Sequence, residues 1–177
     1  RMVSFMYSRQ DIIYEALGVE DRKYSWCKPI CQELNTAMKS RREPSKNDIE
    51  KIWYSDSNDD YCGGINHEHY NQTRYHALNL HSFFSKGTVE FRLFNSTLHA
   101  GKIKAYVQFC LALSAWAIES EGRIVFRSVS GYTSAQKATL MYHILTNRLG
   151  LYGDEFKTCR YHLTRRFKNY AMDIAAA

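Results

Sequence analysis

The sequence reads Arg-Tyr-His-Ala-Leu-Asn-Leu-His at residues 74–81 and Lys-Gly-Thr-Val-Glu-Phe-Arg-Leu-Phe at residues 86–94. Both segments are rich in apolar and aromatic residues, and a Ser-Lys-Gly turn signal lies between them. This pattern predicts two antiparallel strands, at residues 75–83 and 88–94. The strand pair forms the nucleus of a small antiparallel sheet.

The second strand carries charged residues on one of its faces. Successive side chains of an extended segment point to opposite faces. One face is therefore expected to pack on a core and to carry Val89, Phe91 and Leu93. The open face carries Glu90 and Arg92. A carboxylate and a guanidinium two residues apart can hold a metal ion and an anionic oxygen next to each other, so this face is a candidate active site.

Helices are expected before and after the strand pair in the sequence, packed on one side of the sheet. N-terminal capping residues and glycines that follow a helix place them near residues 9–17, 29–39, 45–54, 101–119, 133–148 and 154–168. A further short strand is expected near 124–129. The layout predicts an α+β fold in which helices cover a small antiparallel sheet. We expect one domain over residues 1–177, with a helical region at 1–54 and the strand pair and its helices at 74–170.

Composition limits the chain to one sizeable core. It has 177 residues, of which 45% are apolar, and this length is short for two domains. No run approaches the ~20 uninterrupted apolar residues of a membrane span, and the first residues carry no secretory-signal pattern. We therefore expect a cytoplasmic protein with no membrane contact. The formal charge of +6 suits either a nucleic-acid partner or a site for triphosphate and carboxylate groups.

The cysteines do not form the even framework of a disulfide-stapled secreted module. There are five, at irregular spacing, which favours reduced thiols. Thiolates and imidazoles also suit zinc. A zinc site is therefore an alternative, with the candidate ligands Cys27, Cys31, Cys62, His67 and His69.

Three blocks of the sequence resemble the amidoligases, members of the glutamine-synthetase-like group of ATP-dependent carboxylate–amine ligases. The blocks are Arg-Tyr-His-Ala-Leu-Asn-Leu at 74–80, Gly-Thr-Val-Glu-Phe-Arg-Leu-Phe-Asn-Ser-Thr-Leu at 87–98, and the segment from Arg-Leu-Gly at 148–150 to Gly-Asp-Glu-Phe-Lys-Thr at 153–158. The resemblance implies part of a glutamine synthetase-like catalytic fold. It also implies a ligase that uses ATP and Mg²⁺ to form an amide or peptide-type bond through an acyl phosphate. The implied substrates are a carboxylate and an amine, one of which can be a peptide or protein.

The resemblance also implies roles for individual residues. Glu90 matches a magnesium ligand, and Arg92 matches a position that contacts phosphate or the substrate carboxylate. Arg74 and Asn79 are expected to complete the catalytic group from the preceding strand. Apart from the resemblance, imidazole titrates near neutral pH and suits a general base, and His76 is the first histidine to test for that role. The alternative for His76 is a hydrogen-bonded structural group. The third block adds two expected cofactor-binding residues, Lys157 and Arg160.

One expected feature of the family is missing from the sequence. No Gly-Glu-x-Glu strand, which would supply further metal ligands, is visible. The chain therefore resembles the C-terminal portion of a larger ligase, and we expect an N-terminal segment or partner chain to complete the site. The competing hypothesis is a noncatalytic binding domain on the same scaffold, whose basic helix with Arg165 and Arg166 holds a protein or nucleic acid. The sequence favours the ligase.

Overall fold

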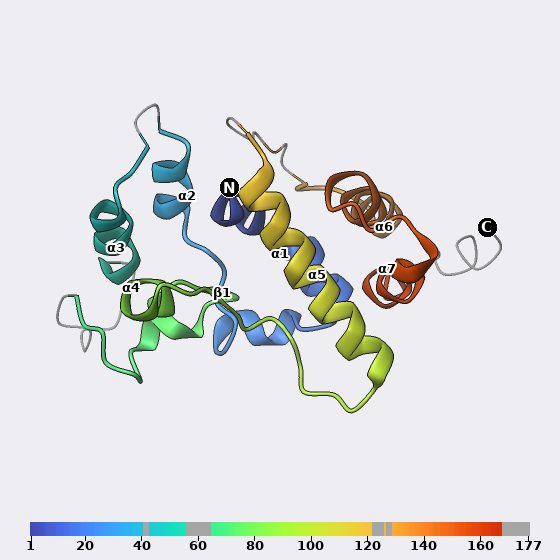
Figure 1. Ribbon diagram of the computed structural model, residues 1–177, viewed down its shortest axis with the longest axis horizontal. Coiled ribbons are helices and arrows are strands. Elements are labelled where there is room, and N and C mark those ends of the chain that lie inside the picture. Colours follow the sequence, from blue (N-terminus) through green and yellow to red (C-terminus); the bar gives the residue numbers. More distant parts are fainter. Residues whose placement is uncertain (41–42, 56–64, 122–125, 127–128, 168–177) are drawn as a thin grey trace. The chain divides into compact units, whose positions relative to one another are not determined.

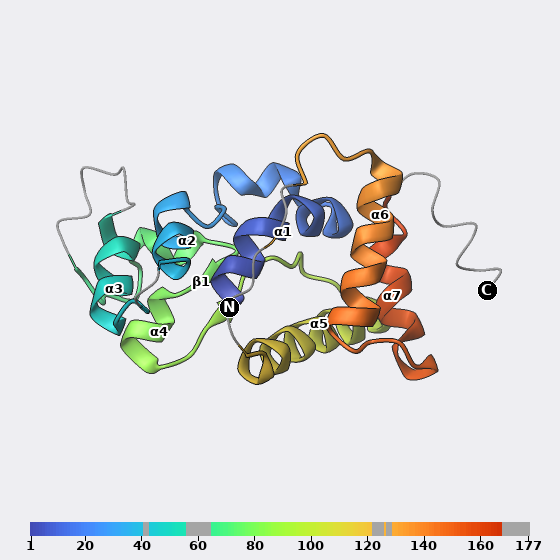
Figure 2. The same cartoon turned by 90° about the horizontal axis from the view of Figure 1, so that it is seen from above.

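The computed structural model describes residues 1–40, 43–55, 65–121, 126 and 129–167 (Figures 1 and 2). The chain divides into two compact units. The first contains Arg1, Val3–Tyr7 and Asp21–Leu93, and the second contains Met2, Ser8–Glu20 and Phe94–Ala177. The described residues are mostly helical with one two-stranded antiparallel sheet, which confirms the α+β prediction.

The first unit is a set of short elements around the sheet. In chain order they are η1 (Glu20–Tyr24), α2 (Gln32–Met38), α3 (Lys46–Ser55), η2 (Gln72–Tyr75), β1 (Leu78–Asn79), α4 (His81–Lys86) and β2 (Glu90–Phe91). Helix α2 packs against α3. The buried side chains of this unit include Leu34, Trp53, Tyr54, Leu78 and Leu93.

The two strands are shorter than the sequence predicted. In the sheet Leu78 pairs with Phe91 and Asn79 pairs with Glu90. The prediction of a strand over 75–83 is wrong, because residues 81–86 form helix α4. The Asn79 side chain accepts a hydrogen bond from the His81 backbone N–H at 2.8 Å and so turns the chain out of the strand, as Asx turns do.

The second predicted strand is also reduced to two residues. The expected burial of its apolar face holds for Leu93 and partly for Phe91, but not for Val89. Leu93 is fully buried, Phe91 is half-buried, and Val89 is 38% exposed. Helix α4 ends at Gly87, whose φ of 73° is a left-handed conformation that glycine adopts without strain.

Helix α1 (Met2–Leu17) contributes residues to both units. It begins seven residues before the predicted start and ends at Gly18, which has a φ of 65°. Helix α2 begins three residues later than predicted. Its N-cap is Cys31, whose sulfur accepts a hydrogen bond from the Leu34 N–H at 3.4 Å. The predicted start of α3 is confirmed, since Ser45 and Asp48 bond each other there.

The second unit is helical. It contains α5 (Ala100–Glu119), α6 (Ser134–His143), the π-helical turn η3 (Ile144–Arg148), η4 (Asp154–Phe156) and α7 (Lys157–Thr164). Helix α7 packs against both α5 and α6 (Figure 2). The interior is formed mainly by Phe109, Leu113, Met141, Leu145 and Leu163.

Several predicted helix ends are confirmed in this unit. Thr133 and Gln136 form the expected capping box, and Gly150 has a φ of 69° just after the π turn. Asp154 does not cap α7 as predicted, because residues 154–156 form a 3₁₀ turn and α7 begins at Lys157. The predicted strand at 124–129 lies largely outside the described residues. None of the helices in the described ranges has the length and apolar character needed to cross a membrane.

Candidate active site

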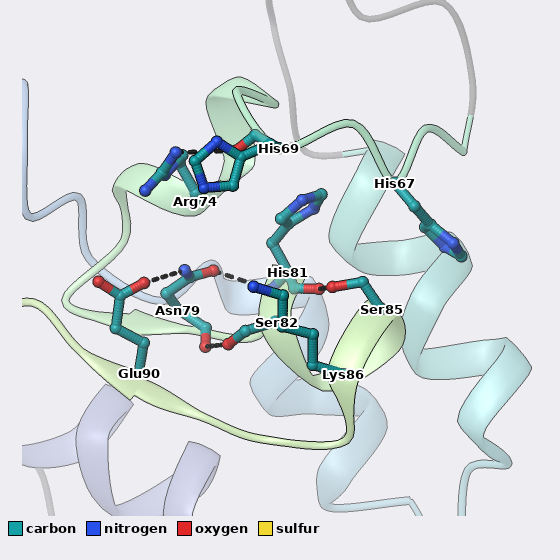
Figure 3. A pocket seen from close by; sticks show the side chains of 9 residues that line it. All are labelled: His67, His69, Arg74, Asn79, His81, Ser82, Ser85, Lys86 and Glu90. Atoms are coloured by element: carbon teal, nitrogen blue, oxygen red, sulfur yellow. Dashed lines mark hydrogen bonds between the residues drawn. The ribbon is translucent and has the colours of Figure 1, made fainter.

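A cavity of about 160 Å³ lies beside the sheet of the first unit (Figure 3). It is open on one side, and its lining combines one carboxylate with several cationic and imidazole groups. The lining residues are His67, His69, Arg74, Asn79, His81, Ser82, Ser85, Lys86 and Glu90. Strand β1, strand β2 and helix α4 therefore each contribute polar residues to the lining of one pocket.

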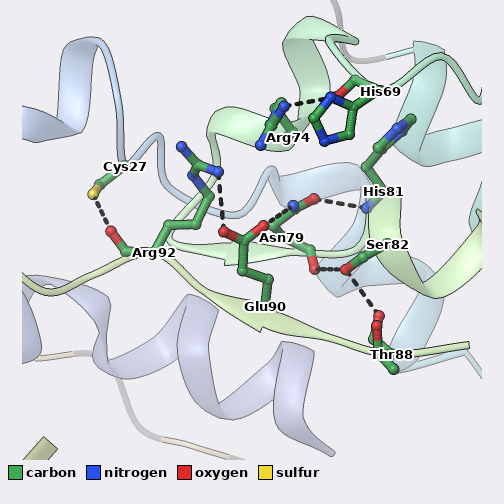
Figure 4. Close-up of polar contacts among 9 residues, drawn as sticks. All are labelled: Cys27, His69, Arg74, Asn79, His81, Ser82, Thr88, Glu90 and Arg92. Carbon is green, nitrogen blue, oxygen red and sulfur yellow. Dashed lines mark hydrogen bonds and ion pairs between the residues drawn. The ribbon is translucent and has the colours of Figure 1, made fainter. Parts of the chain in front are cut away.

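Glu90 is held by a residue on each of its two oxygens. Asn79 lies opposite it in the sheet register and donates its Nδ2–H to Oε2 at 2.7 Å. Arg92, two residues along the same strand, donates an Nη1–H to Oε1 at 3.0 Å (Figure 4). The prediction that the carboxylate and the guanidinium share an open face is confirmed. The Glu90 side chain is 45% exposed, so each oxygen keeps lone-pair capacity for a further partner.

Arg92 is positioned chiefly by its backbone. Its N–H donates to the Ala77 carbonyl at 2.9 Å, and its own carbonyl accepts from the Cys27 thiol at 2.8 Å. The guanidinium lies over the Tyr75 ring at 5.1 Å. Its Nε–H is buried and has no hydrogen-bond partner among the residues that the structure describes. Burial also raises the pKa of the Cys27 thiol. Arg92 therefore has spare donors on a fixed backbone.

Asn79 joins the strand pair to helix α4. Its amide is almost fully buried, and it gives one hydrogen bond to Glu90 and takes one from the His81 N–H. Arg74 lies across the cavity and donates to the His69 carbonyl at 2.7 Å. The structure thus brings four predicted site residues to one place: Arg74, Asn79, Glu90 and Arg92. Their catalytic and metal-binding roles stay predictions.

Three histidines, His67, His69 and His81, line the cavity, and His76 does not. The ring of His76 is buried outside the cavity lining, with its Nδ1 2.7 Å from the Thr73 carbonyl. His81 Nδ1 lies 2.8 Å from the Tyr54 hydroxyl. Burial lowers the pKa of His81 and raises the pKa of Tyr54 to about 12. His81 also bonds the backbone of Glu68. Because Nδ1 faces Tyr54, that bond uses the Nε2–H, and the Nδ1 of the neutral imidazole accepts from the Tyr54 hydroxyl.

Lys157 and Arg160 belong to the second unit, and neither lines this cavity. Lys157 is exposed at the start of α7. Arg160 is buried, and its Nη1 donates to the carbonyls of Leu151 and Gly153, both at 2.8 Å. Its guanidinium therefore anchors the loop that precedes α7. The expected cofactor contacts of both residues stay predictions.

The donor set bears on which ions the site could hold. Among the residues that the structure describes, no group of three or more His, Cys, Asp or Glu side chains could hold a metal. Of the candidate zinc ligands, Cys27 bonds a carbonyl, Cys31 caps a helix, and Cys62 lies outside the described residues. Mg²⁺ is commonly held by one or two carboxylates together with substrate phosphates. Glu90, as a single carboxylate, fits a Mg²⁺ site whose other ligands are substrate phosphates.

Sequence reasoning did not find the contribution of helix α4. Ser82, Ser85 and Lys86 line the cavity from this helix, and the Ser82 hydroxyl also donates to the Thr88 carbonyl at 2.9 Å. Ser82 was predicted in the first strand, and Ser85 and Lys86 in the turn that follows it, so alternation of side chains could not place these residues on one helix. The one available signal was the Asn at position 79, two residues before the first residue of the helix.

Fold and site together define an α+β protein with a small pocket beside a two-stranded antiparallel sheet. A model of the family described as "Putative amidoligase enzyme" matches residues 1–114. The chain therefore belongs to this family, which is an enzyme family of the ligase class. The match includes the first two motif blocks, whereas the block at 148–158 lies beyond it. Neither the curated proteins nor the solved structures gave a match.

Proposed function

We propose that this chain carries part of the active site of an ATP- and Mg²⁺-dependent carboxylate–amine ligase that acts through an acyl phosphate. Family membership supports a ligase in general terms. The finer proposal rests on one observation. Asn79 and Arg92 each donate a hydrogen bond to the Glu90 carboxylate, which lines the cavity. In such a reaction ATP supplies the phosphoryl group that activates the acid, and Mg²⁺ neutralises charge on the phosphates.

The ion pair of Glu90 and Arg92 can open so that each group binds a ligand instead. A partly exposed pair of this kind contributes about 0–1 kcal/mol, so opening it costs little. Glu90 would hold Mg²⁺ through its carboxylate, and Arg92 would donate to an anionic oxygen of phosphate or substrate. Charge-assisted hydrogen bonds from arginine to such oxygens are among the stronger polar contacts in proteins.

The remaining cavity residues supply positive charge and orientation. Arg74 and Lys86 both line the pocket, and cations placed around a transferring phosphoryl group stabilise the charge that develops on it. Asn79 fixes the direction of the Glu90 carboxylate through one short hydrogen bond. His81 is a neutral imidazole whose acceptor nitrogen is already used by Tyr54, so we assign it to the structure of the wall rather than to proton transfer.

The size of the cavity indicates how much of the ligand it receives. Its 160 Å³ is below the ~300–1,000 Å³ of pockets that enclose a drug-sized ligand. We infer that it receives the reacting groups, while further residues hold the rest of the nucleotide and the substrates. We propose that an upstream segment or a partner chain supplies those residues, with Lys157 and Arg160 as further candidates within this chain.

Titration calorimetry with a non-hydrolysable ATP analogue and Mg²⁺ tests the proposal. We expect Mg²⁺-dependent binding that Glu90→Gln weakens at least about tenfold, a loss of about 1.4 kcal/mol. Glu33→Gln is the matched control, since Glu33 is exposed on α2 in the same unit and does not line the cavity. Equal binding by wild type and Glu90→Gln would contradict the metal role. Salt-dependent nucleic-acid binding that survives Glu90→Gln but falls in Arg165→Gln/Arg166→Gln would favour the noncatalytic binding domain instead.

A further inference from the structure

A second cavity lies in the helical unit, within residues that the ligase proposal does not use. Its volume is about 280 Å³. Trp116 of α5 forms one wall, and His143, Asn147 and Arg148 form the rest. No carboxylate is among these lining residues.

The π-helical turn brings the polar residues together. The Leu149 N–H bonds the Ile144 carbonyl at 2.9 Å, five residues back, which widens the last turn of the helix. Asn147 and Arg148, four and five residues after His143, consequently line the same cavity. Single π turns inside α-helices are found frequently at functional sites.

Arg148 is oriented by aromatic rings. Its guanidinium lies 5.7 Å from the Trp116 ring and 5.2 Å from the Phe126 ring. Within the described part of the chain, this guanidinium has no hydrogen bond and no carboxylate partner. Stacking on rings leaves the N–H edge of a guanidinium available for a bidentate partner.

Asn147 also presents its donor end. Its Oδ1 accepts a hydrogen bond from the Thr146 hydroxyl at 2.6 Å. The two N–H groups of its Nδ2 lie on the other side of the amide from that bond. Donors therefore predominate in the cavity lining, because guanidinium and the amide Nδ2 offer only N–H groups, and the Trp116 indole is a donor only.

A second guanidinium adds positive charge nearby. Arg9 is buried, and its guanidinium lies 4.9 Å from the same Phe126 ring. Burial lowers the pKa of Arg9, and the charge of Arg148 lowers it further. Two guanidinium groups that repel each other in this way are both stabilised by an anion placed close to them.

The geometry points to an oxyanion-binding site at Trp116, Asn147 and Arg148, separate from the proposed ligase site. The bound group is a phosphate or a carboxylate, which share the planar or tetrahedral oxygen edge that a guanidinium and an amide recognise. Trp116 lines the cavity beside that group. The ligand is a small molecule that carries the oxyanion.

Two-dimensional ¹H–¹⁵N NMR of the full chain tests the site. The side-chain signals of Trp116, Asn147 and Arg148 are followed during titrations with inorganic phosphate, with acetate and with chloride at matched ionic strength. We expect saturable shifts with phosphate or acetate and none with chloride. Saturation by phosphate alone identifies a phosphoryl ligand, and saturation by acetate alone identifies a carboxylate.

The variants distinguish a site from general charge attraction. Arg148→Gln is expected to weaken binding about tenfold or more, because the charge-assisted hydrogen bonds of the guanidinium to the anion are lost. Asn147→Asp keeps the side-chain shape, places a negative charge in the cavity and is expected to abolish binding. Arg165→Gln is the control, because Arg165 lies over the Tyr161 ring in the same unit, outside this cavity. Shifts that never saturate, or an unchanged affinity in Arg148→Gln, would overturn the assignment.

Discussion

Replacing Asn79 by alanine should destabilise the first unit by about 2–4 kcal/mol. The hydrogen bond to Glu90 is partly replaced by water, because that carboxylate is 45% exposed, and its loss costs about 1 kcal/mol. The His81 N–H is buried at the start of α4, and leaving it without an acceptor costs a further ~1–3 kcal/mol. For a protein whose total stability is about 5–15 kcal/mol, this loss is large for one amide.

Urea unfolding measures this loss if the signal comes from the first unit alone. Trp26 and Trp53 belong to that unit and Trp116 belongs to the other, so a Trp116→Phe background confines the fluorescence to the first. With a slope of about 2–3 kcal/mol/M, the midpoint should fall by about 0.7–2 M. A double-mutant cycle with Glu90→Ala should give a coupling energy of about 1 kcal/mol between the two positions. A change of less than about 0.5 kcal/mol in Asn79→Ala would refute the view that this amide holds the strand pair to α4.

Three further changes have defined outcomes. Burial lowers the pKa of His81 below its usual value near 6.5, so its contribution to stability is complete above that pH and is lost as pH falls through the folded-state pKa. Urea midpoints of the first unit between pH 7 and 5 should therefore fall more steeply in the parent than in His81→Gln. Parallel curves for the two proteins would contradict this. Arg160→Ala should lower the unfolding free energy of the second unit by about 3–5 kcal/mol, read from Trp116, because two carbonyls lose a charged donor; unchanged stability with weaker nucleotide binding would instead support the cofactor role. Thr133→Ala should cost about 1 kcal/mol in thermal unfolding followed by circular dichroism, with Thr133→Ser as the control that keeps the capping oxygen.

Local side-chain rules explain which parts of the fold were predictable. The capping box at Thr133 and the exits at Gly18 and Gly150 depend on residues close in sequence, so their chemistry is readable without a structure. The same is true of Glu90 and Arg92, because alternation along an extended segment needs only two or three residues in strand conformation.

Helix α4 could not be predicted for the opposite reason. The segment His-Ser-Phe-Phe-Ser-Lys contains aromatic residues that suit a strand, and the N-cap position, Leu80, makes no side-chain capping bond. Packing settles its conformation, since Phe84 is buried within 5.7 Å of the Tyr54 ring, and Tyr54 comes from a distant part of the sequence. The lining residues on α4 depend on this tertiary choice. Which way the Arg160 guanidinium points is likewise decided by packing and not by its neighbours in sequence.

The brevity of the sheet has a consequence for how the pocket behaves in time. With two residues in each strand, the ladder offers few backbone bonds, and segments of this kind open locally at low free-energy cost. Amide hydrogens around residues 88–92 should therefore exchange with deuterated solvent well before those of α5 or α7. A ligand that bridges Glu90 and Arg92 would stabilise the strand pair. Slower hydrogen exchange confined to these few amides would then report that the site is occupied, even in the absence of turnover.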